Sequence, residues 1–555
     1  MSASTKKKLR KEENAAKLTE KQLAEQKEAK KLKGYTLAFA IIVSLVLVAA
    51  VAIMGITAFN NSGILQRNTD ALTVGTHTLN NAELNYFYID AVNEFYSTWN
   101  QQYGEYTDMY LSLMGIDSTT PLNKLPYPGS DENRTYADYF KDQAVINATN
   151  TYAIYDLAVA AGHTITDDVK ATYEGNMAMM EMYAGIYSSN GTEGYLKMIY
   201  GPGASMETYR SYMDVLAMSD SYQAAYYDTL TYDDADISAH SNAHFDDFSS
   251  FDYCQYLVDV DDFIVCTDPE NKDHTHSEEE IAAAEAAAKA AAESLAAGTY
   301  ASAEELDKAI NALDVFADAK TPEACTPYES VIYPNIKADV AAWLVADGRT
   351  AGDVDAIASY FTNQDGTDTD ILSGYYVVLF QGREDNNMNL VNVRHILAKF
   401  KGGTTDPATG VTTYADVEKK EALDRITEIL NQWKADGATE EAFVALASEK
   451  SEDTGSKANG GLCENVYPGQ MVEAFNDWCF DTARKVGDYE IVETEFGYHL
   501  IYFVETCDVT FRNYMVENTL RNEDYEAWYT DTTAAIDVKE LNTKYLSLDM
   551  VLSNG

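Results

Sequence analysis

The sequence predicts a mixed α+β protein with an N-terminal transmembrane helix, and three observations support this fold class. An uncharged, mostly apolar run lies close to the N-terminus. The part that follows has apolar residues at helical spacing, and the C-terminal half contains short strand-like runs that alternate with helical segments. About 490 residues follow the apolar run, a length that suggests three domains rather than one.

The first 60 residues have the pattern of a basic tail and a membrane anchor. Residues 1–34 hold eleven Lys/Arg and five Glu, and the next 27 residues hold no charge. At 1.5 Å per residue, Thr36–Phe59 would span roughly 36 Å, more than the ~30 Å hydrocarbon core of a bilayer. Because basic flanks stay inside, we expect a cytoplasmic tail over 1–34, an anchor over 35–60 and an extracytoplasmic remainder. The alternative is a cleavable signal peptide, whose apolar core is normally shorter.

The part beyond the tail is strongly acidic. Subtracting the tail's eleven basic and five acidic residues from the 40 and 89 of the whole chain leaves 29 and 84, a net charge of −55. Such a surface cannot neutralise phosphates, which excludes nucleic acid as a partner. Acidic runs such as Asp233–Asp236 and Asp259–Asp262 lack the spacing of a calcium loop, so no metal is expected.

Six cysteines lie beyond the anchor, at positions 254, 266, 325, 463, 479 and 507. An even number in an exported chain permits disulfides, with 15 possible full pairings that the sequence does not distinguish. The spacings do not form a dense framework. We therefore expect most of these cysteines to be unpaired.

Residues 62–250 are predicted to form a helical domain. Tyr136–Ala161 has apolar residues at helical spacing and is followed by Gly162, which suits a helix C-terminus. Thr166 and Ser205 are the expected N-caps of two further helices. Helices within 508–555 are expected to complete this domain.

The C-terminal half contains an internal repeat. Trp343-x5-Arg349-x2-Gly352-Asp353 recurs 135 residues later, beginning at Trp478. Other segments also match in order: Tyr253–Leu257 with Val393–Leu397, and Gly374–Val378 with Gly497–Ile501. Each copy has a predicted helix followed by glycine, over Ser277–Ala297 before Gly298 and over Ala415–Asp436 before Gly437. We therefore expect two related units, at 251–382 and 388–506.

Four sequence blocks between Val391 and Phe503 carry a resemblance to a known family. They are Val-Arg-His-Ile-Leu, Ser-Glu-Asp-Thr-Gly-Ser-Lys-Ala-Asn-Gly-Gly-Leu, Gly-Gln-Met-Val-Glu-Ala-Phe and Phe-Gly-Tyr-His-Leu-Ile. In this order they resemble the parvulin-type peptidyl-prolyl cis/trans isomerases. The resemblance implies an antiparallel sheet flanked by helices over 388–506, and isomerisation of X-Pro bonds without a cofactor. The order of domains is similar to that of SurA/PrsA-type foldases, which implies a chaperone role for the helical part.

The resemblance also implies which residues form the site. Met471 and Phe475 would be two walls of a proline pocket, on one helix face if 472–480 is helical, with Leu462 as a third wall. Phe496 would line the edge of the pocket. A Met/Phe pair at this spacing, taken without its context, is more often simply core.

His395 and His499 would form the polar floor of the site, on adjacent central strands, by hydrogen bonding of fixed tautomer. Asp453 would face the substrate carbonyl, and Thr494 would hydrogen-bond into the histidine network. The alternative for Asp453 is a turn residue that caps the segment 451–456.

Some positions depart from the family pattern. The first copy has Gln255 and Tyr376 where the histidines belong, so we expect a degenerate, non-catalytic unit. In the second copy Cys463-Glu464 replaces the usual glycine and apolar residue, and one extra residue precedes Met471. Because no arginine cluster follows His395, phospho-specific binding is not expected.

Together these features predict a membrane-anchored, extracytoplasmic foldase. Its partners would be unfolded or newly exported proteins with X-Pro bonds and, through Thr36–Phe59, the membrane. The main alternative is a non-catalytic holdase or scaffold whose two repeat units only bind chain. A cell-surface adhesin has only the acidic charge in its favour.

Overall fold

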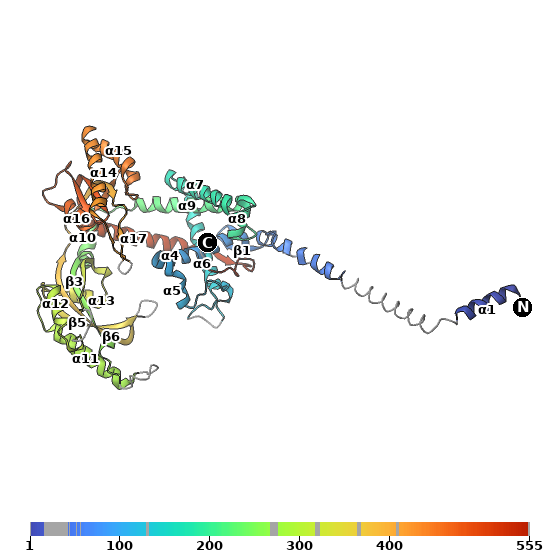
Figure 1. Ribbon diagram of the computed structural model, residues 1–555. Coiled ribbons are helices and arrows are strands. Elements are labelled where there is room, and N and C mark those ends of the chain that lie inside the picture. Colours follow the sequence, from blue (N-terminus) through green and yellow to red (C-terminus); the bar gives the residue numbers. More distant parts are fainter. Residues whose placement is uncertain are drawn as a thin grey trace. The chain divides into compact units, whose positions relative to one another are not determined.

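The computed structural model describes residues 2–15, 43, 45–51, 53–55, 57–128, 133–266, 276–316, 322–362, 368–406 and 410–552. Its contacts divide the chain into two compact units. The helical unit comprises Met1–Leu230 and Asp524–Gly555, and the two-sheet unit comprises Thr231–Glu523. Figure 1 shows their elements coloured along the sequence.

The N-terminal part contains α1 (Ala3–Ala15) and, among the described residues, one helix that is long and apolar enough to cross a membrane by length and composition alone, Leu45–Arg67. Within this range, a turn at residues 61–63 precedes the short helix α3 (Ile64–Arg67), whose N-cap Gly63 is left-handed. Residues 1 and 16–34 of the predicted tail, and residues 35–42, 44, 52 and 56 of the predicted anchor, lie outside the described residues.

Six helices make up most of the helical unit: α4 (Asn81–Tyr103), α5 (Thr107–Leu113), α6 (Tyr136–Ala160), α7 (Asp167–Tyr187), α8 (Gly191–Tyr200) and α9 (Met206–Thr229). Their core is rich in aromatic side chains, among them Tyr86, Tyr88 and Phe140. A short antiparallel sheet, in the order β13-β1-β2, joins this core. Its strands are β1 (Asp70–Val74), β2 (His77–Asn80) and β13 (Val538–Glu540).

The C-terminal segment returns to the helical unit. Leu72 of β1 pairs with Glu540 of β13, and the Asn81 side chain donates a hydrogen bond to the Asn542 carbonyl at 2.7 Å. α17 (Phe511–Ala534) spans the division of the chain, and its later part packs on α9, where Trp528 stacks on Tyr226 at 3.9 Å.

The helix ends follow local capping chemistry, with one difference from expectation. Ser205 caps α9 by accepting a hydrogen bond from the Thr208 amide, and Gly162 follows α6 with φ +67°. Thr166 precedes α7 but its side chain makes no capping bond. Its amide donates to the Ser221 hydroxyl at 3.0 Å, a contact with α9 that the sequence pattern does not reveal.

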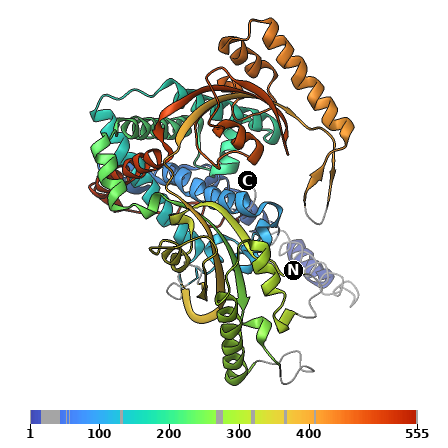
Figure 2. The ribbon, with the colours of Figure 1, turned by 90° about the vertical axis from the view of Figure 1, so that its left-hand side faces the viewer.

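The two-sheet unit contains two four-stranded antiparallel sheets, both visible in Figure 2. The first has the order β4-β3-β6-β5, with β3 (Ser250–Asp259), β4 (Thr326–Ile332), β5 (Val354–Thr362) and β6 (Asp368–Glu384). The second has the order β10-β7-β12-β11, with β7 (Asn389–Lys399), β10 (Leu462–Val466), β11 (Tyr489–Thr494) and β12 (Gly497–Thr510). A small hairpin, β8 (Thr404–Thr405) and β9 (Thr412–Thr413), follows β7.

Helices cover both faces of each sheet. On the first sheet, α11 (Glu278–Ala296) and α12 (Ala303–Ile310) pack on one face and α13 (Ala338–Leu344) on the other. On the second sheet, α14 (Asp416–Ala435) and α15 (Glu440–Lys450) lie opposite α16 (Glu473–Phe480). α10 (Asp234–Ala243) packs against the start of α17.

Equivalent contacts recur in the two sheets. Leu257 pairs with Tyr376 in the first sheet, and Leu397 pairs with His499 in the second. In each, an arginine places its guanidinium over a tryptophan ring, at 3.8 Å for Arg349 on Trp343 and 4.0 Å for Arg484 on Trp478. Each of these arginines also donates from Nε to the carbonyl of the same tryptophan.

One disulfide, Cys254–Cys325, links β3 to the residue before β4, and the other four cysteines are free. The expectation that most cysteines are unpaired is confirmed. Gly298 follows α11 but does not take the left-handed conformation expected of it. A Cβ there would collide with the Tyr300 ring, whose hydroxyl donates to the Leu295 carbonyl at 2.9 Å. Close packing of that tyrosine therefore requires the glycine.

Candidate active site

Two buried histidines lie side by side on the central strands of the second sheet. His395 lies on β7 and His499 on β12, and both rings face α16 because they alternate with residues that face α14. Their Nδ1 atoms are 3.0 Å apart, and the side chains are 7% and 5% exposed. The pair is therefore a hydrogen-bonded polar floor beneath a mostly apolar helix.

A carboxylate and a hydroxyl lie at one end of this pair. His395 Nε2 is 3.1 Å from Ser456 Oγ and 3.3 Å from Asp453 Oδ2. The Ser456 hydroxyl and amide both donate to Asp453, at 2.6 and 2.8 Å. Asp453 thus caps the turn at Ser456, as the alternative interpretation predicts, and it also contacts His395. Its position facing a substrate carbonyl stays a prediction.

At the other end, Thr494 Oγ1 lies 2.9 Å from His499 Nε2. Thr494 is the last residue of β11, and its hydroxyl also accepts a hydrogen bond from the Phe496 amide at 3.2 Å. The tight turn into β12 therefore holds this hydroxyl against the ring.

The donors and acceptors assign a direction to the whole chain of hydrogen bonds. Ionised Asp453 can only accept, and the Ser456 proton is directed at it, so His395 must donate from Nε2. Neutral His395 then accepts at Nδ1 from His499, which accepts at Nε2 from Thr494. One arrangement of protons, with both rings neutral, thus satisfies all five side chains.

The electrostatics agree with a neutral His499 ring and an ionised Asp453 carboxylate. Burial first, and the neighbouring His395 second, lower the pKa of His499 to about 3. The hydrogen bond from His395, followed by those from Ser456, holds the pKa of Asp453 below its usual range against the effect of burial. Burial and the nearby Asp453 raise the pKa of Cys463 to about 11, so this thiol is not a nucleophile at neutral pH.

The predicted apolar walls surround this floor in part. Phe475 on α16 is buried and meets both rings edge-on, with ring centroids 5.4 Å from each. Met471 is half-buried and packs on the same core cluster, but it precedes α16 rather than lying on it. The expected shared helix face is therefore wrong for Met471, because the helix begins only after its N-cap Val472. Leu462 is half-buried on β10, and Phe496 is 54% exposed in the turn before β12.

Sequence reasoning missed two residues of this site. Ser456 bridges Asp453 and His395. Its position three residues after Asp453, which suits a hydrogen bond across a turn, could have indicated this contact from the sequence. Gly461 lies where a Cβ would collide with the His395 carbonyl, and its φ is +74°. Glycine there lets the loop hydrogen-bond to β7 through the His395 amide at 2.8 Å.

The first sheet has no such cluster at the equivalent positions. Tyr376 pairs with Leu257 as His499 does with Leu397, and Lys337 lies over its ring at 5.8 Å. Within the part of the chain that the structure describes, no group of three or more His, Cys, Asp or Glu is arranged to hold a metal ion.

Residues 375–506 match the family model described as the PPIC-type PPIASE domain. The second sheet, its helices and the histidine pair therefore form a parvulin-type domain, as the sequence predicts. The match begins within β6, earlier than the predicted boundary at residue 388.

The chain is also similar to known foldases and chaperones. Foldase protein PrsA 3 of Bacillus cereus is 31% identical over 115 residues, which cover 20% of this chain and 40% of that protein. Chaperone SurA of Chromohalobacter salexigens is 35% identical over 136 residues, or 23% and 27% of the two chains. The crystal structure of PrsA from Bacillus anthracis is 20% identical and covers 27% of this chain and 59% of that chain, with a TM-score of 0.17. The chain thus spans less than half the length of these two curated relatives.

Proposed function

We propose that this protein is an extracytoplasmic peptidyl-prolyl cis/trans isomerase and chaperone that assists the folding of exported proteins. The observation that carries the proposal is the directed hydrogen-bond chain from Thr494 through His499 and His395 to Asp453. Its two histidines are buried beneath Phe475, and it lies in the segment that matches the isomerase family.

The reaction needs little covalent chemistry. An X-Pro bond isomerises over a barrier of roughly 20 kcal/mol because the amide must lose its resonance. An enzyme that binds the twisted amide better than either planar isomer lowers this barrier without a nucleophile. Apolar walls for the proline ring and a fixed charge beside the carbonyl are sufficient.

The residues present suit these two tasks. We assign the proline ring to the space bordered by Phe475, Met471 and Leu462, with Phe496 at its edge. Asp453, kept ionised by its hydrogen bonds, would repel negative charge on the substrate oxygen and so favour the twisted state. The histidines would hold the floor in place rather than transfer a proton, since their protons are already committed within the chain.

For the domain layout we propose a helical chaperone domain over 62–250, completed from 508–555, followed by a degenerate unit at 251–382 and the active unit at 388–506. The shared strand order, the equivalent pairing of Tyr376 and His499 and the repeated Arg–Trp contacts support an origin of the two units by duplication. Gln255 and Tyr376 make the first unit non-catalytic.

For the location we propose a single membrane span with a cytoplasmic tail over 1–34 and all other domains outside. The candidate span Leu45–Arg67 and the basic tail support this arrangement. The unfolded clients would be proteins newly exported across the same membrane. The acidic outer part supports the exclusion of nucleic acid.

A protease-coupled assay on the purified full chain tests the activity. A proline peptide cleaved only in its trans form should isomerise faster than the uncatalysed reaction, and the excess rate should disappear in Asp453→Ala. If the rate equals the uncatalysed one and the chain still suppresses aggregation of an unfolded protein, the function is that of a non-catalytic holdase and not of an isomerase.

A further inference from the structure

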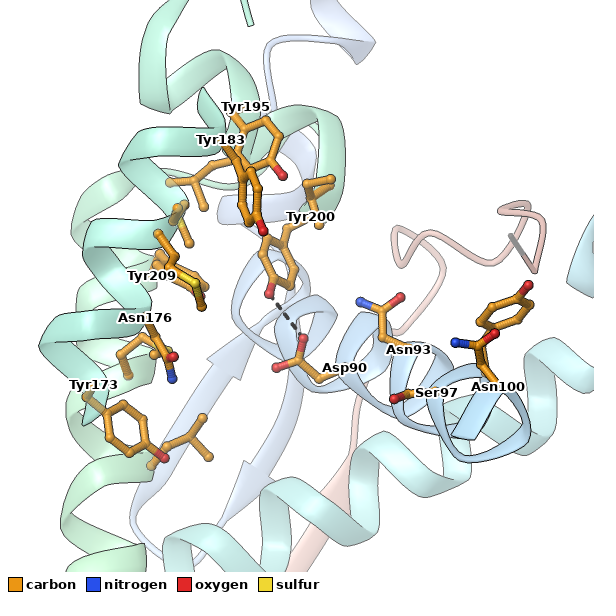
Figure 3. Close-up of a pocket in the computed structure, with 17 residues that line it drawn as sticks. Asp90, Asn93, Ser97, Asn100, Tyr173, Asn176, Tyr183, Tyr195, Tyr200 and Tyr209 are labelled. Atoms are coloured by element: carbon orange, nitrogen blue, oxygen red, sulfur yellow. Dashed lines mark hydrogen bonds between the residues drawn. The ribbon is translucent and has the colours of Figure 1, made fainter. Parts of the chain in front are cut away.

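The helical unit contains a cavity of about 610 Å³ that the isomerase site does not use. α4 lines one side of it with polar side chains, including Asp90 and Asn93, as Figure 3 shows. α7, α8 and α9 line the other side with tyrosines and methionines, among them Tyr183, Tyr195 and Met179. Such walls can adapt to different apolar groups, because methionine is flexible and tyrosine offers both a ring face and a hydroxyl.

Asp90 is the distinctive residue of this cavity. Its two carboxylate oxygens accept hydrogen bonds from Tyr200 at 3.1 Å and from Tyr212 at 2.7 Å, so both donors are neutral phenols. Burial raises the pKa of Asp90, and these two hydrogen bonds oppose that effect. Asp90 therefore has hydrogen-bond partners for both carboxylate oxygens, but neither partner carries a positive charge.

The charged side chains that line this cavity and the neighbouring cavity that shares Asp90 are all carboxylates. The described residues that line this cavity include no lysine or arginine. Asp90 also lines a neighbouring cavity of about 350 Å³ with Glu94 and Asp220, where the described lining again includes no basic side chain. Three carboxylates therefore act on this part of the unit without a compensating cation, and they favour a positively charged occupant.

From this charge and shape we propose that the cavity binds a lysine or arginine side chain of an unfolded polypeptide, with Asp90 as its counter-ion and the tyrosine rings as its walls. The bound cation would balance the negative charge of Asp90, and the faces of the tyrosine rings would attract it further. The apolar neighbours of the basic residue would contact the methionines. This proposal rests on the proposed chaperone function and specifies which clients it prefers.

Two fluorescent peptides test the preference on the full chain. Both lack proline and share one apolar sequence, and one carries arginine where the other carries citrulline, which keeps the size of the side chain but not its charge. We expect the arginine peptide to bind about tenfold more tightly. Asp90→Asn should abolish this difference and leave the citrulline peptide unaffected. Asp228→Asn, an equal charge change at an exposed position of α9, should preserve it.

A second pair of variants does not depend on the stability of Asp90→Asn. Met179 is 51% exposed at the cavity, so its replacement should not disturb the core. Met179→Arg supplies an internal cation and should remove the arginine preference, whereas Met179→Gln should retain it.

Equal binding of the two peptides to the unmodified chain, or a preference that survives both Asp90→Asn and Met179→Arg, would overturn the cation site alone. Absence of binding by either peptide, in a preparation that still isomerises X-Pro bonds, would overturn the chaperone role together with it. Because the peptides contain no proline, the isomerase result is independent of either outcome.

Discussion

At the scale of single residues, we expect loss of His499 or Met471 to reduce isomerase activity most clearly. His499→Ala breaks the hydrogen-bond chain in its middle, and Met471→Ala opens a gap beside the proline ring. Burial of a methionine side chain contributes roughly 2–3 kcal/mol, and loss of about 1.4 kcal/mol of preference for the twisted amide is a tenfold loss of rate. Each variant should therefore lose at least about tenfold in kcat/KM in the protease-coupled assay.

The matched control is Tyr376→Ala, at the position in the first sheet that corresponds to His499. Its rate should stay close to that of the unmodified chain, provided that circular dichroism shows a retained fold. If this variant loses activity and His499→Ala does not, the active unit is the first one.

The depressed pKa of His499 predicts a pH dependence of stability. In the unfolded chain the ring binds a proton below about 6.5, whereas in the folded chain it does so only near 3. Between these values the unfolded state binds more protons, so the free energy of unfolding falls as pH falls. At about pH 5 the loss from this group should approach 2 kcal/mol relative to pH 7.

Urea unfolding of the full chain at both pH values, compared with His499→Asn, measures this contribution. The asparagine variant should lose less stability than the unmodified chain on acidification. Equal losses would show that the ring is protonated in the folded state.

The sequence predicted His395, His499, Asp453 and Thr494 as one cluster because each falls in a recognisable block, and the structure brings them together. It did not predict Ser456, because a serine in a polar turn is common and its bridge depends on how the loop approaches β7. Motif spacing can identify the residues that carry the chemistry. Contacts between loops and strands can be identified only once the fold is known.

At the scale of elements, two glycines should have different effects on activity. A Cβ on Gly497 would collide with the Ala398 carbonyl, and a Cβ on Gly374 would collide with the Val258 carbonyl in the first sheet. Gly497→Ala should push β12 away from β7, separate the two histidines and lower the isomerase rate by at least about tenfold. Gly374→Ala should lower the thermal stability of the chain and leave the rate nearly unchanged. Similar rate losses in both variants would mean that the first sheet takes part in catalysis.

The disulfide is a second test at this scale. Alkylation of the denatured chain without reductant should label four thiols, and six after reduction, as counted by intact mass. Because Cys254 and Cys325 are 71 residues apart, their link should stabilise the folded state by at most about 4 kcal/mol through the unfolded chain. Six labelled thiols without reductant would refute the link.

The elements themselves were more predictable than their ends. Apolar spacing located α6 to within a residue, because its buried face repeats along the helix. The capping pattern at Ser277 and the glycine at 298 located α11 equally well. The start of α16 after Met471, the uncapped Thr166 and the choice of Cys325 as partner of Cys254 depend on contacts between distant segments. The local propensity of a segment does not depend on those contacts and so cannot predict them.

At the scale of the whole molecule, the proposed topology predicts a protection pattern. External protease added to intact cells should degrade everything beyond the membrane and spare the tail Met1–Lys33, because only the tail lies inside. Immunoblotting with one antibody to the tail and one to 388–506 measures this. A protected 388–506 segment, together with a tail that is digested already in intact cells, would reverse the orientation.

The one-way order of the hydrogen bonds also bears on how such a site is inherited. If one histidine were replaced by an apolar residue, the other would keep a buried ring nitrogen without its partner, at a cost of about 1–3 kcal/mol. A chain with one histidine is then less stable than a chain with both or with neither. Selection should therefore keep or discard the two rings as a pair, and the first sheet, with Gln255 and Tyr376 at the two equivalent positions, has neither.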